Sequence, residues 1–253
     1  MKKFIAQSEA SKKILNIAQM SSSLPVNVLI IGEIGVGKKL LAQNILPDAS
    51  YFDAKILEET LMNGKFNIDE YKELIILNID TVLNKKEFLL YLNGIKIVAT
   101  SNRNLTDIES QFAIKIDIPP LNQRIEDLEE LKKVYLSEAN DIYNTNIDIN
   151  DLAFDLSLNG NTLKNSIYKT VSMRALSDDD MMESLEFFIS NKFNEDKDYR
   201  ELLQYFEIPL LNAAKKRFKS QLKMATKLNL NRITLRKKLE QYFQETPDNR
   251  LGE

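Results

Sequence analysis

The most informative segment of the chain reads Gly32-Glu33-Ile34-Gly35-Val36-Gly37-Lys38-Lys39. It fits the pattern G-x-x-x-x-G-K of a phosphate-binding loop, in which glycines let backbone N–H groups face a phosphate and the lysine reaches its outer oxygens. The apolar run Val28-Leu29-Ile30-Ile31 precedes it and Leu40-Leu41-Ala42 continues as a helical pattern, which is the context that the motif requires. We therefore predict that these residues bind a nucleotide: Gly32, Glu33, Gly35, Val36, Gly37, Lys38, Lys39 and Leu40.

One position of this segment departs from the pattern. The loop usually ends in Ser or Thr, whose hydroxyl ligates Mg²⁺, but this chain has Lys39 there. An ammonium cannot ligate a metal, although its charge could neutralise phosphate in the place of the metal. The sequence thus predicts a site for ATP or ADP and leaves the use of Mg²⁺ open. The structural alternative is a vestigial turn that is kept for packing.

The composition excludes several kinds of site. The chain has 253 residues and is 43% hydrophobic, which supports a folded core in one or two domains. Because it has no Cys and no His, disulfides, thiol catalysis, Cys-ligated zinc and a Ser-His-Asp mechanism are excluded. No apolar run reaches the length of a membrane span, and the first residues do not form a secretion signal. We predict a cytoplasmic protein without a membrane partner, and we assign no catalytic or metal-ligating residue.

Charge is distributed unevenly along the chain. Residues 204–243 contain ten Lys and Arg and only two acids, Glu207 and Glu240, which gives this segment a net charge of +8. Because the whole chain has a net charge of −3, the remainder carries −11. This asymmetry favours a nucleic-acid-binding tail on an acidic body.

The order of apolar runs and helical patterns predicts an α/β fold. A helical pattern covers residues 8–20, and apolar runs follow at 28–31, 74–77 and 95–99, with a helical stretch at 86–92 between the last two. Apolar strands that alternate with helices are typical of a parallel sheet covered on both faces. We assign residues 1–118 to this nucleotide-binding α/β domain, which ends where Pro119 and Pro120 interrupt regular structure.

The rest of the chain is predicted to be helical. Helical patterns from residue 124 to 175, followed by a helix that Ser177 caps and that runs through Phe188, predict a helical lid over residues 119–189. Residues 190–203 are mostly polar and are the predicted linker. Residues 204–246 are the predicted DNA-binding domain.

Segments of the first two thirds of the chain occur in the order seen in one protein family. Residues 8–39 resemble the entry into the AAA+ domain of the NtrC-like bacterial enhancer-binding proteins, which activate sigma-54 polymerase. Residues 95–105 resemble the strand that ends in their sensor-one Asn, here Asn102. Residues 118–128 resemble their LPPLRERxEDI segment, and residues 160–165 resemble a shortened GNVRELEN. The resemblance implies an AAA+-like sheet with a helical lid and a contact from Asn102 to the γ-phosphate; the alternative is that Asn102 only caps a loop.

The C-terminus is similar to the Fis-type helix-turn-helix of the same family. Residues 221–228 match the first helix, Asn229-Leu230 the turn and residues 231–239 the recognition helix. Such a helix lies in the major groove and reads base edges, while Lys and Arg contact phosphates. The resemblance implies double-stranded DNA as a partner and these DNA-binding residues: Arg232, Thr234, Arg236, Lys237 and Lys223. The alternative is a solvated basic helical hairpin.

A segment before this motif is similar to the apolar helix that Fis-type domains use to dimerise. It reads Ile208-Pro209-Leu210-Leu211-Asn212-Ala213-Ala214, and Pro209 is tolerated in the first turn of a helix. We predict a homodimer or a higher homo-oligomer. The alternative is that this face packs on its own helix-turn-helix.

Several family features are missing. No GAFTGA loop, which engages sigma-54, lies between Lys39 and Leu74, and the acidic strand end DE is replaced by Asn78 and Ile79, with Asp80 one residue later. Residues 106–115 contain no Arg, and the sensor-two Arg falls where residues are deleted. No receiver domain precedes the loop segment, so we expect no phosphorelay input. Because metal ligation, water orientation and an arginine finger each change hydrolysis by orders of magnitude, these losses argue against a working motor.

We therefore predict a DNA-binding transcriptional regulator whose degenerate AAA+ module binds nucleotide or mediates oligomerisation and does not remodel sigma-54 polymerase. One alternative is a non-catalytic partner of a paralogous, complete enhancer-binding ATPase. Another is a weakly active ATPase that uses Asp80.

Overall fold

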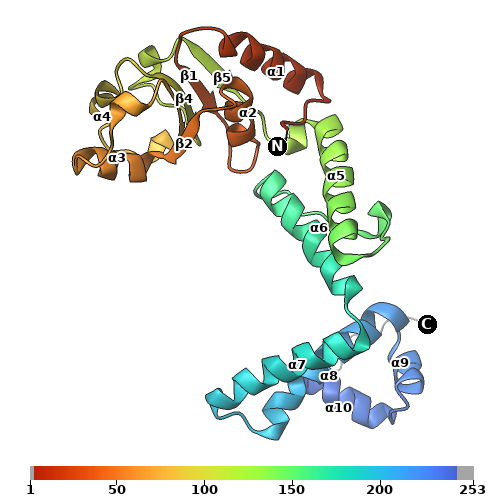
Figure 1. Cartoon of the computed structure of the whole chain (residues 1–253). Coiled ribbons are helices and arrows are strands. Elements are labelled where there is room, and N and C mark those ends of the chain that lie inside the picture. Colours follow the sequence, from red (N-terminus) through yellow and green to blue (C-terminus); the bar gives the residue numbers. More distant parts are fainter. Residues whose placement is uncertain (1–2, 244–253) are drawn as a thin grey trace. The chain divides into compact units, whose positions relative to one another are not determined.

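Five parallel strands form the sheet that places the glycine-rich loop (Figure 1). They are β1 (Val28–Ile31), β2 (Ser50–Asp53), β3 (Glu73–Leu77), β4 (Lys96–Ser101) and β5 (Ile114–Asp117). Their order in the sheet is β2-β3-β4-β1-β5, and every neighbouring pair is parallel. The predicted parallel α/β sheet is therefore confirmed. β1 lies between β4 and β5. The glycine-rich loop follows the carboxyl end of β1 and therefore lies at the carboxyl edge of the sheet.

The computed structural model describes residues 3–243. The chain folds into two compact units, Met1–Ala175 and Leu176–Glu253. The sheet and the lid belong to the first unit. The second unit contains the predicted helix-turn-helix. Residues 244–246, which we assigned to the DNA-binding domain, lie outside the described residues.

β2 was not predicted from the sequence. Its residues, Ser-Tyr-Phe-Asp, form neither an apolar run nor a regular alternation, because β2 lies at the edge of the sheet and pairs only with β3. An edge strand is partly exposed, and Tyr51 is 50% exposed. The apolar signal that identifies the buried strands is therefore weak here.

Helices cover both faces of the sheet. Alternate residues of β1 point to opposite sides, so Val28 and Ile30 pack in one core cluster with α1 (Glu9–Ser22) and α2 (Lys38–Ile45). Leu29 and Ile31 pack in the other cluster, with α3 (Ala54–Met62) and α4 (Lys85–Tyr91). Burial on both faces explains why β1 is a continuous apolar run.

The lid contains two long helices and its own core. α5 (Ile125–Tyr143) packs against α6 (Gly160–Ala175), and Leu128, Leu163 and Ile167 are among the buried residues between them. We predicted helical structure around Leu152, Phe154 and Leu156, but these residues lie in the connection between the two helices, half-buried against the lid core. Short 3-10 helices occur at these places: Ile68–Glu70, Ile79–Thr81, Glu109–Gln111, Leu121–Gln123, Ile149–Asp151 and Phe193–Glu195.

The second unit begins earlier than the sequence suggested. It contains α7 (Asp178–Lys192), α8 (Tyr199–Phe218), α9 (Gln221–Lys227) and α10 (Arg232–Phe243). α7, which we had placed in the lid, belongs to this unit, and the predicted linker at 190–203 falls on the end of α7 and the start of α8. Both helices begin with a capping box, at Ser177/Asp180 and at Asp198/Glu201, and such polar caps make a helical segment look like a linker.

Pro209 lies in the interior of α8 and not in a first turn. Because Asp198 caps the helix eleven positions earlier, our expectation of a helix start near Pro209 is wrong. A proline has no N–H to donate to the carbonyl of Tyr205, so α8 lacks one backbone hydrogen bond there.

Among residues 3–243, no helix combines the length and the apolar character needed to cross a bilayer.

Candidate functional site

The glycine-rich segment forms the loop between β1 and α2, as predicted. Gly35 and Gly37 have φ angles of +80° and +105°, which glycine adopts without the strain that other residues incur. Gly35 is also a point of close approach, because an added Cβ would lie 2.1 Å from the backbone oxygen of Leu158 in the lid. The N–H of Gly160 donates to the oxygen of Gly35 at 3.1 Å. Position 35 thus requires glycine both for its backbone conformation and for contact with the lid.

Lys38 is held inside the loop. Its Nζ donates to the backbone oxygens of Gly32 at 2.6 Å and Glu33 at 2.7 Å, and to Oδ1 of Asn102 at 2.9 Å. These contacts use the three donors of the ammonium. The side chain is buried, and burial lowers its pKa, although the carboxylates of Asp80 and Glu33 act in the opposite direction. An incoming phosphate would therefore meet a preorganised cation that can exchange one of these acceptors for a phosphate oxygen.

Asn102 connects Lys38 to an acidic side chain. It follows β4, the strand at whose end the sequence placed it, and β4 pairs with β1 in the sheet. Its backbone N–H donates to Oδ1 of Asp80 at 3.1 Å, and its Nδ2 lies 3.4 Å from Oδ2 of Asp80. Asp80 belongs to the 3-10 helix that follows β3, whereas Ile79 is fully buried in the core. The carboxylate that could compensate for the missing acidic strand end thus contacts Asn102.

The positions where the loop motif would place magnesium ligands hold other groups. The ammonium of Lys39 lies over the ring of Tyr51, 3.5 Å from its centroid. Nδ2 of Asn78 donates to Oδ2 of Asp53 at 2.9 Å, and Oδ1 of Asp53 accepts from the N–H of Lys55. Within residues 3–243 no three acidic side chains converge as metal ligands. An ammonium and an amide that acts as a donor do not fit the oxygen ligands that Mg²⁺ requires.

A cleft of about 570 Å³ lies beside the loop, between the N-terminal segment and the lid. The loop residues from Gly35 to Leu40 line it, and Asn102, Asn78 and Thr100 line its sheet side. Apolar walls come from Phe4 and from Leu131 and Val134 of the lid. Gly32 and Glu33 are not part of the lining, and instead their carbonyls hold Lys38. The remaining predicted nucleotide-binding residues are therefore brought together at one cleft.

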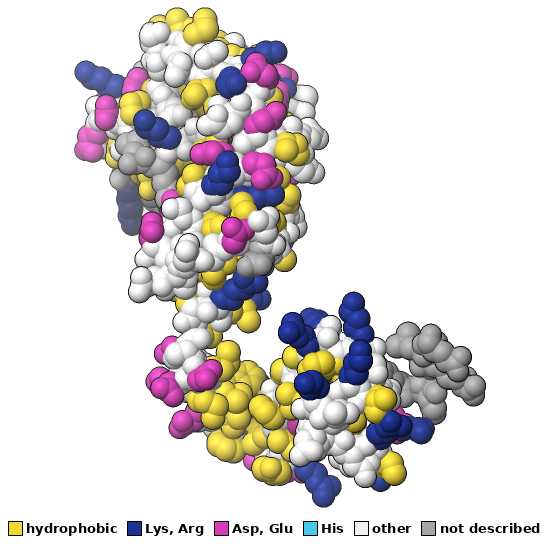
Figure 2. All heavy atoms as spheres, turned by 90° about the vertical axis from the view of Figure 1, so that its right-hand side faces the viewer, with side chains coloured by type: hydrophobic (Ala, Val, Ile, Leu, Met, Phe, Trp, Pro, Cys, Tyr) yellow, Lys and Arg dark blue, Asp and Glu magenta, His cyan; other side chains and the backbone are white. Residues whose placement is uncertain are grey.

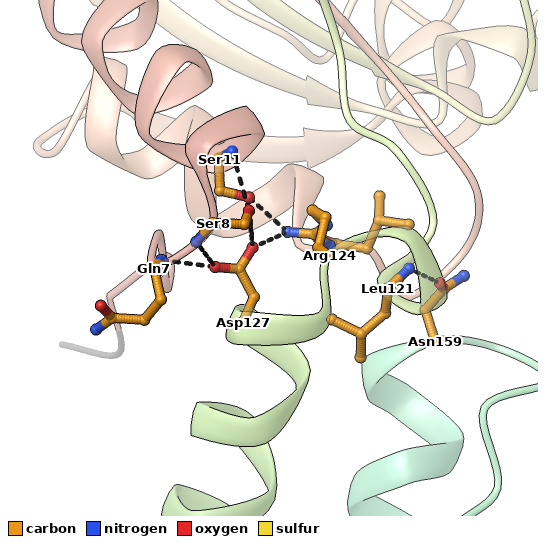
Figure 3. A network of polar contacts seen from close by, with 8 residues as sticks. Gln7, Ser8, Ser11, Leu121, Arg124, Asp127 and Asn159 are labelled. Carbon is orange, nitrogen blue, oxygen red and sulfur yellow. Dashed lines mark hydrogen bonds and ion pairs between the residues drawn. The ribbon is translucent and has the colours of Figure 1, made fainter.

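A buried polar network joins the lid to this loop (Figure 3). Arg124 donates from Nη2 to the oxygen of Val36 at 3.0 Å and from Nη1 to Oδ2 of Asp127 at 3.3 Å. Asp127 is completely buried and accepts from the N–H groups of Gln7 and Ser8 at 2.6 and 2.8 Å, and from the hydroxyls of Ser8 and Ser11 at 3.1 and 2.5 Å. One carboxylate thus ties the start of α1 to the start of α5.

Electrostatics explain why this buried pair is stable. Burial alone would raise the pKa of Asp127, but the hydrogen bonds from Ser11, Ser8 and Gln7 hold it below the ordinary value. Burial lowers the pKa of Arg124, and the attraction of Asp127 opposes that effect. Arg124 Nε has no hydrogen-bond partner, although the guanidinium lies over the ring of Phe4. The sequence assigned no role to Arg124 or Asp127 individually, although both lie in the segment 118–128 that resembles LPPLRERxEDI.

Asn159 forms the second connection between lid and loop. Its Nδ2 donates to Oε2 of Glu33 and to the oxygen of Ile34, both at 3.0 Å, and its Oδ1 accepts from the N–H of Leu121 at 2.6 Å. Its φ of +52° is one that Asn adopts more readily than most residues. Glu33, which we predicted to bind nucleotide, therefore contacts the lid through its side chain.

The C-terminal residues predicted to bind DNA lie on two helices of the second unit. α9 and α10 are joined by residues 228–231, and Met224, Ala225, Leu235 and Leu239 form the core beneath them together with Leu211 of α8. All five predicted side chains are exposed: Lys223, Arg232, Thr234, Arg236 and Lys237. Arg236 donates to Glu240 at 2.7 Å.

The core of this unit also involves residues at the ends of these helices. On α9, Leu222 is 52% exposed and Met224 is buried. Tyr242 and Phe243, at the end of α10, pack against the core. The hydroxyl of Tyr242 donates to Glu207 at 2.7 Å, and Lys238 also pairs with Glu207, so one carboxylate of α8 holds α10 in place.

Residues 4–79 match the family model of the Sigma-54 interaction domain. No curated protein matches the chain in sequence. Among solved structures, NtrX from Brucella abortus in complex with ADP is 16% identical, with a TM-score of 0.57 over 94% of this chain and 68% of NtrX. The complex of NtrX with ATP is 14% identical, with a TM-score of 0.51 over 95% and 69%. At this identity the likeness establishes the α/β fold, and the matching segment includes the glycine-rich loop.

Proposed function

We propose that this protein is a DNA-binding regulator whose first unit binds a nucleotide and does not hydrolyse it efficiently. One observation supports this most strongly. Lys38 is buried in a glycine-rich loop at the edge of a large cleft, while the neighbouring positions that should hold a metal carry Lys39 and Asn78. The site thus has the features of binding without those of hydrolysis.

The ligand class follows from the cleft and its relatives. Backbone N–H groups, a cationic Lys38 and apolar walls suit a phosphate chain attached to an aromatic base. NtrX, which has a similar fold, was crystallised with ADP and with ATP. We propose that this chain binds the same class of nucleotide.

Weak hydrolysis follows from the chemistry at the sheet edge. Asn78 replaces a metal-bound carboxylate and Ile79 is buried in the core, so neither can orient a metal or a water. The alternative of a weakly active ATPase would have to use Asp80, whose carboxylate already accepts from Asn102.

The second unit supports binding to double-stranded DNA. Arg232, Thr234 and Lys237 are exposed on α10, the second helix of the predicted helix-turn-helix, and Lys223 is exposed on α9. A helix in this position can enter the major groove while flanking cations contact phosphates. This basic surface corresponds to the segment of net charge +8.

Dimerisation is proposed on a different surface from the one predicted. Leu211 and Ala214 are buried in the core of their own unit, as in the alternative we considered. Large apolar side chains are exposed on the same unit instead, and Figure 2 shows a wide hydrophobic area there. They include Met182, Phe187, Phe193 and Phe206, with exposed fractions of 66%, 72%, 62% and 56%. Exposed apolar area of this kind marks an interaction surface, and we propose a second copy as its occupant.

Binding of ADP to the full-length protein by calorimetry tests the nucleotide site. We expect binding by the natural protein and by Lys65→Ala, an exposed lysine away from the loop, and loss of binding in Lys38→Ala. Equal binding by Lys38→Ala and the natural protein would contradict the proposed site.

DNA binding is tested separately on the same protein. Lys237→Ala and Arg232→Ala should weaken binding to duplex DNA, and Lys237→Ala should reduce the dependence of affinity on salt by about one phosphate contact. Lys55→Ala, an exposed lysine in the first unit, is the control. Unchanged DNA affinity in the α10 variants would remove the DNA-binding part of the proposal.

A further inference from the structure

A chain of contacts runs from the phosphate-binding lysine to a carboxylate. Nζ of Lys38 donates to Oδ1 of Asn102 at 2.9 Å. The backbone N–H of Asn102 donates to Oδ1 of Asp80 at 3.1 Å, and its Nδ2 lies 3.4 Å from Oδ2 of the same carboxylate. Asn102 lines the cleft, and its side-chain nitrogen lies beside the carboxylate of Asp80.

The position of this carboxylate relates it to the end of the phosphate chain. In a loop of this type, backbone N–H groups surround the inner phosphates and the lysine reaches the outer ones. Asn102 follows the carboxyl end of β4 and accepts from Lys38, and Asp80, in the 3-10 helix after β3, accepts in turn from Asn102. A third phosphate would approach Lys38 and Asn102 and would therefore meet the charge of Asp80.

No divalent cation is expected to offset this repulsion. A magnesium ion normally bridges the β- and γ-phosphates and neutralises their charge. Here Lys39 lies over Tyr51 and Asn78 donates to Asp53, so the donor set does not fit that ion. The fixed cations of the loop, Lys38 and Lys39, are suited to the smaller charge of a diphosphate.

We propose that the site selects a nucleoside diphosphate without a divalent cation, and that Asp80 disfavours a third phosphate. This inference rests on the proposed nucleotide-binding function. It identifies Asp80 as a residue that determines specificity, and it assigns no catalytic step to it.

Calorimetry of the full-length protein with ADP and with ATP, each in EDTA and in excess Mg²⁺, tests the inference. We expect ADP to bind about tenfold more tightly than ATP, the size of effect that one like-charge contact near the surface can produce. We also expect the ADP affinity to change by less than about twofold between EDTA and Mg²⁺, because no side chain is arranged to ligate the ion.

The variant Asp80→Asn keeps the shape of the side chain and removes its charge. It should raise the affinity for ATP more than that for ADP, and so reduce the difference between them. Asp117→Asn removes the same charge from the same sheet edge, at the end of β5, and should leave the ratio of the two affinities unchanged.

The outcomes separate this inference from the function on which it rests. ATP binding as tight as ADP binding, or a ratio that Asp80→Asn does not change, would overturn the role of Asp80. ADP binding that requires Mg²⁺ would overturn the absence of a cation. If neither nucleotide binds, the proposed nucleotide site fails, and this inference fails with it.

Discussion

The guanidinium of Arg124 donates to the backbone oxygen of Val36, with Nη2 and the oxygen 3.0 Å apart. Val36 lies inside the glycine-rich loop, and Arg124 immediately precedes α5 of the lid. The same guanidinium pairs with Asp127, which in turn holds Ser8 and Ser11 at the start of α1. The loop, the lid and the N-terminal segment therefore meet at one buried ion pair.

Arg124→Lys should destabilise the first unit. An ammonium cannot reproduce the planar set of donors that contacts both Val36 and Asp127, so at least one buried acceptor loses its partner. We expect a loss of about 2–3 kcal/mol in the free energy of unfolding, measured by chemical denaturation. Arg200→Lys makes the same chemical change at an exposed position of α8 and should be close to neutral. Equal stability of the two variants would show that the network contributes little.

Acid should weaken the same network. Asp127 has a pKa that is lower in the folded chain than its ordinary value of 3.8, so the stability it contributes is fully present above about pH 4. This contribution is lost as the pH falls from there through the folded pKa. Asp127→Asn should be less stable at pH 7 by about 3 kcal/mol, because the Arg124 charge stays buried without a counterion.

The measurement is the free energy of unfolding of both proteins between pH 7 and pH 3. We expect the difference between the natural protein and Asp127→Asn to become smaller as the pH falls below 4. A difference that is constant over this range would mean that Asp127 does not titrate in the way its hydrogen bonds imply.

The loop and the buried strands could be predicted from the sequence because their signals are local. Val28–Ile31 is a continuous apolar run, and the motif that follows it is written in eight consecutive residues. The lid network could not be predicted in the same way. Asp127 contacts Ser11 and Gln7, which are 116 and 120 residues away in the chain, and no local pattern encodes such a pairing.

The start of α8 in the second unit was predicted at the wrong residue. Pro209 suggested the beginning of a helix, but the capping box of Asp198 and Glu201 begins α8 earlier, and tertiary packing of Leu211 outweighs the cost of an interior proline. Likewise, the sequence placed Asn78 at a strand end but gave no indication that its amide donates to Asp53 on β2, a strand that itself was not predicted.

Gly35→Ala should separate the lid from the loop. The added methyl group would lie 2.1 Å from the oxygen of Leu158, and the φ of +80° is strained for any residue with a Cβ. We expect destabilisation of at least about 2–3 kcal/mol, together with faster hydrogen exchange at the start of α6.

Gly64→Ala provides a matched control. Gly64 also has a positive φ, +63°, but an added Cβ there would meet no atom within 4 Å. Its cost should be limited to backbone strain of about 1 kcal/mol, without a change in exchange at α6. If the two alanine variants behave alike, the lid contact of Gly35 adds nothing to the strain of its backbone.

The double change Lys39→Thr with Asn78→Asp should make nucleotide binding depend on magnesium. It supplies a hydroxyl at the end of the loop and a carboxylate at the end of β3, which are the ligands that the motif provides in its usual form. In the natural protein we expect Mg²⁺ to leave nucleotide affinity nearly unchanged. In the double variant, Mg²⁺ should raise the affinity for ATP by about tenfold, which corresponds to about 1.4 kcal/mol.

Calorimetry with ATP, in EDTA and in Mg²⁺, checks this expectation, and each single variant serves as its own control. Lys39→Thr alone removes a cation without completing the ligand set, so it should weaken binding in EDTA and gain little from Mg²⁺. Asn78→Asp alone adds a negative charge to the lining of the cleft, and its repulsion of the phosphates should weaken binding without a metal. A natural protein that already gains tenfold from Mg²⁺ would show that oxygen ligands other than these two positions hold the ion.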